Sequence, residues 1–135
     1  MSVSVLVVDD EADIRTAVAE VLSEEGYEVY AAGDGREALA QLRDKQPSVV
    51  LLDLMMPGMN GWEFRREQQR EPELSDIPVI VLSAMGRAPA IEAQSFLQKP
   101  FDLDTLLDEV RRWTSRETER RAAPGTDADA AAAPS

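Results

Sequence analysis

The sequence contains no cysteine and no histidine among its 135 residues. Without cysteine the chain can form neither disulfide bonds nor thiolate metal sites. Without histidine it also lacks the commonest general base and nitrogen ligand. Any metal ion that this protein binds must therefore be held by oxygen atoms.

Positive charge, aromatic residues and long apolar runs are also scarce. The net charge of −12 argues against direct nucleic-acid binding, which requires clustered Lys and Arg. Aromatic residues make up 5% of the chain and apolar residues 44%, so one domain with an aliphatic core is expected. No apolar stretch approaches the ~20 residues of a membrane span. The N-terminal SVSVLVV lacks the basic flank of a signal peptide, and the expected location is the cytoplasm.

Short apolar runs alternate with helical patterns, which is typical of an α/β fold with a parallel sheet. Strands are predicted at Ser4–Val8, Glu28–Ala32, Val49–Asp53, 77–83 and Ser95–Gln98. The second strand is more polar than the others and is expected at an edge. The third is a continuous apolar run, which suits a strand buried on both faces.

Helices are predicted between these strands. Apolar residues at helical spacing precede Gly26, and Asp34 with Glu37 resembles a capping box at the start of a second helix. A third helix is predicted to open near Gly61, although RREQQRE offers it little to bury. The last helix carries one apolar stripe, formed by Leu106, Leu107, Val110 and Trp113.

Carboxylates stand where two of the predicted strands end. The first strand is followed by Asp9, Asp10 and Glu11, and the third ends in Asp53. In open α/β sheets, ligands bind at the carboxyl ends of the strands. Each residue alone could be a helix cap or a turn residue, but clustered carboxylates repel one another unless a cation lies among them. Oxygen ligands without Cys or His select Mg²⁺ or Mn²⁺.

Four sequence stretches, VLVVDDE, LLDLMMPGMNG, VIVLSA and FLQKPF, resemble in order and spacing the signature stretches of response-regulator receiver domains. The resemblance covers about residues 2–113. It implies a doubly wound five-stranded parallel sheet with the flavodoxin-like order 2-1-3-4-5. It also makes Asp53 the phosphoacceptor of a two-component signalling protein.

The same resemblance assigns a metal site. It places Asp10 and Asp53 directly on Mg²⁺, with Asp9 bound through water and the Met55 backbone carbonyl as a further ligand. The stretch that contains Met56, Pro57, Gly58 and Gly61 resembles the conformationally special loop of receivers.

The resemblance also implies contacts to the phosphoryl group. Lys99, the Ser83 hydroxyl and Ala84 are expected to contact its oxygen atoms. Ser83 and Phe96 take the positions of switch residues; the alternative for Phe96 is a buried aromatic on an edge strand. The Lys99–Pro100 bond is a candidate cis peptide. Glu11 is expected to assist the start of the first helix rather than to bind metal.

The stretch between Ser83 and Phe96 departs from the family pattern. Its twelve residues are fewer than the resemblance leads us to expect by roughly one to two helical turns. Pro89 fits the first position of a helix, which leaves residues 89–95 for a shortened, irregular fourth helix.

The leading functional hypothesis is a stand-alone cytoplasmic response regulator. A sensor histidine kinase would phosphorylate Asp53, and the output would be contact with an unknown downstream protein or onward phosphotransfer, without binding to nucleic acid or membranes. Such a protein assists its own phosphorylation and dephosphorylation and is not otherwise an enzyme; it is expected to be a monomer or weak dimer. Residues 1–116 form the receiver domain, and 117–135 a helix extension and a disordered tail rich in Ala, Pro and Asp.

Two alternatives belong to other functional classes. An aspartyl-nucleophile phosphohydrolase of the haloacid-dehalogenase type would need a second carboxylate two residues after the nucleophile, where this chain has Met55. A receiver-like binding module would work without phosphate. The complete set of Asp10, Asp53, Ser83 and Lys99 argues against that module.

Overall fold

A single parallel sheet forms the centre of the computed structural model, which describes residues 3–84 and 91–122, with side chains as far as Thr114. Its strands are β1 Ser4–Val8, β2 Glu28–Ala32, β3 Val49–Asp53, β4 Val79–Ser83 and β5 Ser95–Gln98, in the order β2-β1-β3-β4-β5. The helices within the described residues are α1 Ala12–Glu24, α2 Gly35–Lys45, α3 Gly61–Arg70 and α4 Leu103–Ala122. The predicted fold class and strand order are confirmed.

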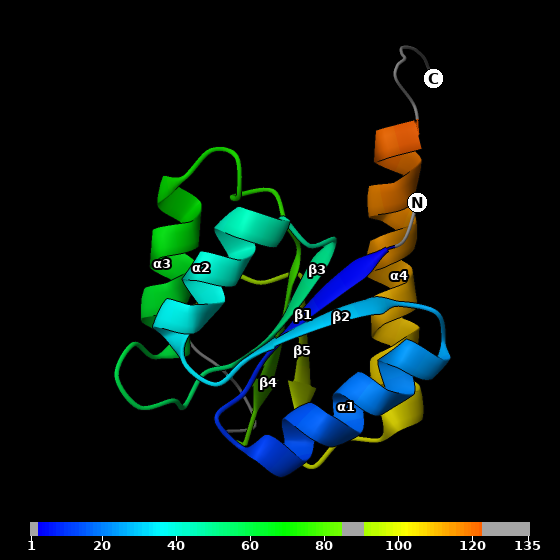
Figure 1. Ribbon diagram of the computed structural model, residues 1–135, viewed down its shortest axis with the longest axis horizontal. Coiled ribbons are helices and arrows are strands. Elements are labelled where there is room, and N and C mark those ends of the chain that lie inside the picture. Colours follow the sequence, from blue (N-terminus) through cyan, green and yellow to red (C-terminus); the bar gives the residue numbers. More distant parts are fainter. Residues whose placement is uncertain (1–2, 85–90, 123–135) are drawn as a thin grey trace.

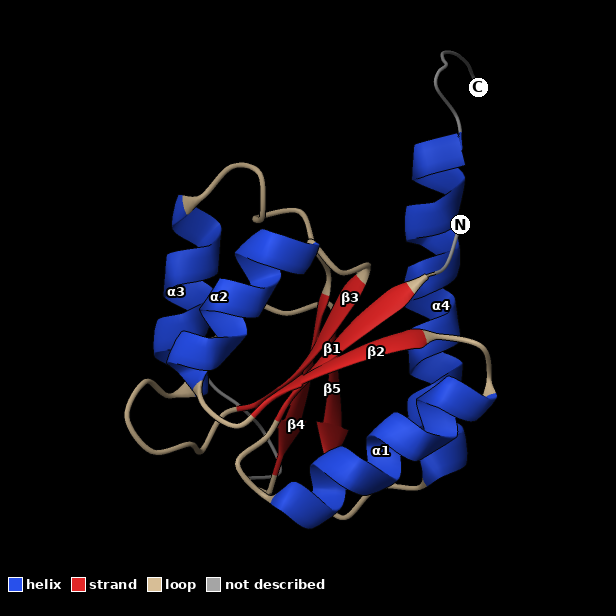
Figure 2. Ribbon diagram, viewed as in Figure 1, coloured by secondary structure: helices blue, strands red, loops and turns tan. Residues whose placement is uncertain are grey.

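The helices cover the two faces of the sheet in pairs. Helices α2 and α3 lie on one face and α1 and α4 on the other (Figure 1 and Figure 2). Side chains alternate between these faces along each inner strand. In β3, for example, Val50 and Leu52 join the core under α2 and α3, whereas Val49 and Leu51 join the core under α1 and α4. The apolar runs of the sequence thus belong to strands buried on both faces.

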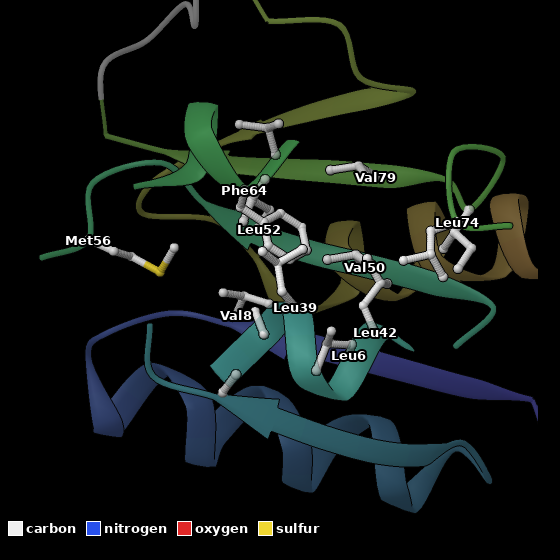
Figure 3. Close-up of a cluster of buried hydrophobic side chains, with 14 of the residues drawn as sticks. Leu6, Val8, Leu39, Leu42, Val50, Leu52, Met56, Phe64, Leu74 and Val79 are labelled. Atoms are coloured by element: carbon white, nitrogen blue, oxygen red, sulfur yellow. The ribbon is translucent and has the colours of Figure 1, made fainter. Parts of the chain in front are cut away.

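Each core is built mainly from aliphatic side chains. On the α2/α3 face, Leu39 and Leu42 of α2 and Phe64 of α3 pack with Val50 and Leu52 of β3 (Figure 3). All five side chains are at most 5% exposed. This packing fixes β3 as a rigid element at the centre of the sheet.

The crossover from β4 to β5 corrects the sequence prediction. Residues 85–90 lie outside the described part of the chain, residues 91–94 are not helical, and Ser95 already belongs to β5. The Gln94 backbone N–H donates to Val79 O at 3.0 Å, and the Val79 N–H donates to Gln94 Oε1 at 2.7 Å. Fewer than two helical turns are too short to be stable alone. Bonding to β4 therefore extends the backbone where the end of a helix was predicted.

Helix α3 contributes two buried polar side chains, Arg65 and Gln68, which we call the crossover clamp. Arg65 donates through Nη1 to Gln68 Oε1 at 2.7 Å and through Nε to Glu92 O at 2.8 Å. Gln68 Nε2 donates to the backbone oxygens of Leu74 at 2.9 Å and Ile77 at 3.0 Å. The clamp joins α3 to the segments before β4 and β5. The expectation that RREQQRE has little to bury is wrong for these two residues.

Helix α4 is much longer than the strands that it packs against. Its 20 residues span about 30 Å, whereas a five-residue strand spans about 17 Å. One end of the helix extends past the sheet (Figure 1). It continues beyond the predicted boundary at residue 116, and the predicted tail at 123–135 lies outside the described residues. None of the helices in the described residues is both long and apolar enough to span a bilayer.

Candidate functional site

Four strands bring polar residues to one edge of the sheet. Asp9 follows β1, Asp53 ends β3, Ser83 ends β4 and Lys99 follows β5. Parallel pairing aligns these ends, because Asp53 lies beside Leu82 and Ser83 beside Gln98 in register. The Lys99 backbone N–H also donates to Ser83 O at 2.8 Å. Residues separated by up to 90 positions in the sequence are therefore neighbours at this edge.

Three carboxylates, which we call the acidic cluster, gather here: Asp9, Asp10 and Asp53. One oxygen atom of each lies within 4.8 Å of the others. Asp9 is fully buried and Asp53 is 4% exposed, whereas Asp10 is exposed. Three oxygen donors at this separation, without nitrogen or sulfur ligands, fit a hard divalent cation such as Mg²⁺. The structure brings together the three side chains that the sequence assigned to a metal site.

Lys99 provides the positive charge at the acidic cluster. Its Nζ lies 2.9 Å from Asp9 Oδ2 and 3.5 Å from Asp53 Oδ2, and its side chain is only 12% exposed. Burial by itself lowers the pKa of Lys99, but the neighbouring carboxylates outweigh burial and raise this pKa above its usual value. Lys99 therefore stays protonated beside the acidic cluster.

The surroundings of Asp53 disfavour the ionised form of its carboxyl group. Burial and, after it, the negative charge of Asp9 raise the pKa of Asp53 to about 7. Lys99 and the Met55 N–H, which donates to Asp53 Oδ1 at 3.2 Å, act in the opposite direction. A cation bound at the acidic cluster would favour the ionised form of Asp53, because opposite charge lowers a carboxyl pKa.

The loop after β3 is held close to the strand that it follows. Gly58 has a positive φ of 70°, which other residues rarely adopt. A Cβ atom on Gly61 would lie 2.7 Å from the Cα of Leu54, so only glycine fits at the start of α3. Asn60 and Glu63 close this start with a capping box. The loop after β3, which the sequence predicted to be conformationally special, thus favours glycine at positions 58 and 61.

Other predicted site residues lie around this centre. Ser83 is buried and the next residue, Ala84, is exposed. The Lys99–Pro100 peptide bond is cis, the conformation expected from the sequence. Phe96 lies beside Val81 in the sheet and is 46% exposed, so the alternative that it is a buried aromatic is wrong.

Glu11 lies at the start of α1, but its side chain pairs with Lys99 rather than with the helix backbone. It occupies the N-cap position of α1, but its side chain accepts no capping hydrogen bond. Its Oε1 instead lies 3.2 Å from Lys99 Nζ. The Glu11 carboxylate therefore does not cap α1 through a hydrogen bond. The opposite charges were visible in the sequence, but 88 residues separate the partners and no spacing rule joins them.

A mainly apolar groove lies beside the acidic cluster. Its volume is about 560 Å³, and its lining includes Ile14, Ala17 and Val18 of α1 together with Phe101 and Leu103. Lys99 and Ala84 also line it. The groove thus adjoins two of the phosphate-binding candidates, Lys99 and Ala84.

A comparison with protein families decides what this arrangement belongs to. The family model described as the response regulator receiver domain matches residues 5–111. The chain belongs to the response-regulator receiver family. The matched residues include the acidic cluster, Ser83 and Lys99, so the receiver match covers the whole of the site.

Individual relatives agree with this assignment. The receiver chain is 34% identical to Sporulation initiation phosphotransferase F of Bacillus subtilis over 119 residues, which cover 84% of this chain and 94% of that protein. Among solved structures, the chemotaxis protein CheY4 of Vibrio cholerae superposes with a TM-score of 0.78 at 35% identity, covering 84% of this chain and 99% of that one.

Several curated relatives are longer, and the chain spans about half their length. Response regulator RR06 of Streptococcus pneumoniae, for example, is 40% identical over 114 residues, which cover 80% of this chain and 51% of that protein. Receiver domains are signalling domains rather than classical enzymes, and they work by phosphorylation. They interact with histidine kinases and downstream effectors and typically bind Mg²⁺ at an acidic pocket.

Proposed function

We propose that this receiver accepts a phosphoryl group on Asp53 from a histidine kinase, with Mg²⁺ bound at the acidic cluster. One observation carries the proposal: the Asp53 carboxylate ends a buried strand, next to two further carboxylates and a lysine. An isolated buried carboxylate would be neutral and a poor nucleophile. These neighbours supply both a place for a cation and a fixed positive charge.

The side chains of the site have distinct tasks in the proposed reaction. A carboxylate oxygen of Asp53 forms a bond to phosphorus while the bond from phosphorus to the donor nitrogen breaks. Lys99 neutralises charge on the phosphoryl oxygens, and the Ser83 hydroxyl and the backbone at Ala84 contact them. When bound, Mg²⁺ would be held by Asp10, Asp53 and the Met55 carbonyl, with Asp9 through water, and would supply positive charge to the same oxygens.

The groove beside the acidic cluster supports a protein rather than a small molecule as the phosphoryl donor. Its apolar lining from α1, including Ile14 and Ala17, lies next to Lys99. A partner that presents a phosphohistidine beside an apolar surface could bury that surface here while its phosphoryl group reaches Asp53. Mn²⁺ is expected to replace Mg²⁺, because both prefer oxygen ligands.

The output of the phosphorylated protein is proposed to be contact with a downstream protein or onward phosphotransfer to another protein. Ser83 and Phe96 would transmit the change, since Ser83 would meet the phosphoryl group and Phe96 pairs across the β4–β5 ladder with Val81, two residues before Ser83. Phe96 has no hydroxyl group, so it would act by packing alone. The receiver would act in the cytoplasm as a monomer or weak dimer.

Phosphorylation with a small phosphodonor such as acetyl phosphate tests the proposal. The unsubstituted protein should gain one acid-stable, base-labile phosphoryl group by intact-mass spectrometry, and removal of Mg²⁺ with a chelator should prevent this. Asp53→Asn should abolish the modification, whereas Asp44→Asn, an exposed substitution with the same charge change, should leave it intact. Full modification of the Asp53→Asn protein would disprove the site. No modification of any protein would favour a binding module that works without phosphate.

A further inference from the structure

Among the described residues, three carboxylates pair with Lys99, and two of them belong to the proposed metal site. Its Nζ contacts Asp9 at 2.9 Å and Asp53 at 3.5 Å, and both belong to the acidic cluster. A divalent cation at the cluster therefore competes with the ammonium group for the same carboxylates. Two positive charges so close together also repel each other. Lys99 must give up part of its contacts when the metal ion arrives.

Within the part of the chain that the structure describes, Glu11 is the carboxylate that pairs with Lys99 from outside the acidic cluster. Its Oε1 lies 3.2 Å from Lys99 Nζ, and its side chain is 60% exposed. The Glu11 backbone is fixed, because its N–H donates to Asp9 Oδ1 at 2.9 Å. The third carboxylate around Lys99 is thus held at the rim of the site, outside the three-carboxylate cluster that a metal ion would occupy.

We propose that Glu11 is a positioning residue that holds the Lys99 ammonium group at the rim of the site while a divalent cation occupies the acidic cluster. The inference rests on the proposed function, because it presumes a metal ion at Asp9, Asp10 and Asp53. An exposed ion pair is weak, so Lys99 remains able to move onto an incoming phosphoryl oxygen. Glu11 therefore favours metal binding, because it gives the displaced lysine a partner outside the acidic cluster.

The structure offers a matched control for this role. Asp13 is also exposed and acidic, and it lies in the first turn of α1, two residues after Glu11. Glu11→Gln and Asp13→Asn remove the same charge from the same helix end. The Glu11 side chain forms no capping bond, so its substitution should not destabilise α1. Thermal unfolding of both variants verifies this.

Calorimetric titration with Mg²⁺ measures the effect. Glu11→Gln should weaken Mg²⁺ binding about 3- to 10-fold, whereas Asp13→Asn should weaken it less than about 2-fold. Lys99→Met should strengthen binding, because the competing ammonium is gone. In the Lys99→Met background, Glu11→Gln should then have less than about a 2-fold effect. Equal weakening by Glu11→Gln in both backgrounds would show that Glu11 acts directly on the metal ion, and would overturn the inference.

A second measurement follows Lys99 itself. The chain contains two lysines, Lys45 and Lys99, so selective labelling gives two side-chain NMR signals. Lys45 is exposed and serves as the internal reference. In saturating Mg²⁺, the ε-methylene of Lys99 should remain less mobile than that of Lys45, and Glu11→Gln should remove this difference. Equal mobility of both lysines in the unsubstituted Mg²⁺-loaded protein would contradict the inference.

The two proposals fail in different ways. If the unsubstituted protein does not bind Mg²⁺, the proposed metal site is wrong, and the role of Glu11 falls with it. If Mg²⁺ binds normally but Glu11→Gln behaves like Asp13→Asn, only the role of Glu11 is overturned.

Discussion

The acidic cluster and the crossover clamp are both polar and buried, but their interactions are balanced differently. In the clamp, Arg65 donates to Gln68 and to the Glu92 carbonyl, Gln68 donates to two further backbone oxygens, and these four hydrogen bonds measure 2.7–3.0 Å. In the cluster, three carboxylates each place an oxygen atom within 4.8 Å of the others, and Lys99 contacts two of them, Asp9 and Asp53. Buried polar groups that form hydrogen bonds stabilise a fold. Like charges gathered at one edge of a sheet repel one another unless a ligand of opposite charge binds there. The difference separates a structural role from a functional one.

Replacing Arg65 should have the largest effect on stability. Arg65→Met removes one buried and one partly buried hydrogen bond and leaves Gln68 Oε1 and the Glu92 carbonyl without this donor. We expect the free energy of unfolding to fall by about 2–4 kcal/mol. The neighbouring Arg66 is exposed, and Arg66→Met should change it by less than about 0.5 kcal/mol. Equal effects in urea denaturation would show that the clamp has no structural role.

Replacing Gln68 should have a somewhat smaller effect. Gln68→Leu keeps the approximate volume but leaves the carbonyl oxygens of Leu74 and Ile77 without their side-chain donor, at a cost of about 1–3 kcal/mol. Gln69 is exposed, so Gln69→Leu is the matched control. Phosphorylation of the folded Gln68→Leu protein should be unchanged. A loss of phosphorylation without a loss of stability would reverse the roles assigned to the two regions.

Replacing Asp53 should have the opposite effect on stability, because the substituted protein should gain stability relative to the unsubstituted one as the pH rises. Its pKa is raised from 3.8 to about 7 in the folded metal-free protein. The protonated form is thus favoured by folding, and the stability that it contributes is lost as the pH rises from about 4 through about 7. Asp53→Asn cannot ionise, so its stability relative to the unsubstituted protein should rise by about 1–3 kcal/mol between pH 4.5 and pH 8. Thermal unfolding in chelator measures this, and saturating Mg²⁺ should reduce the difference at pH 8. A difference in stability that does not depend on pH would contradict the raised pKa of Asp53.

Ser83 should give the smallest change of the four. Ser83→Ala is expected to lower the free energy of unfolding by less than about 1 kcal/mol and Mg²⁺ affinity by less than about 2-fold, because its hydroxyl is assigned to the phosphoryl group. Asp10→Asn is the comparison, since loss of a metal-binding carboxylate should weaken Mg²⁺ binding by about 10-fold or more. A large loss of Mg²⁺ affinity in Ser83→Ala would place this residue with the metal ligands instead.

The sequence predicted the sheet and the acidic cluster because both follow from local patterns. Continuous apolar runs such as Val49–Asp53 mark buried strands, and parallel strands bring their carboxyl ends to one edge. Arg65 was not predicted to be buried, because its partner is a backbone oxygen brought near by the crossover. The pairing of Glu11 with Lys99 likewise depends on two distant strand ends. Contacts that form only when distant segments pack together produce no periodic pattern in the sequence, so these contacts could not be predicted from it.

The length of α4 has a mechanical consequence. The helix spans about 30 Å, and its buried side chains between Leu106 and Thr114 pack against the sheet. A tilt of about 10° about Leu103 would therefore move Ala122 sideways by about 5 Å, Thr114 by about 3 Å and Leu106 by less than about 1 Å. A small change of angle at the start of α4 would thus produce its largest displacement at the far end of the helix.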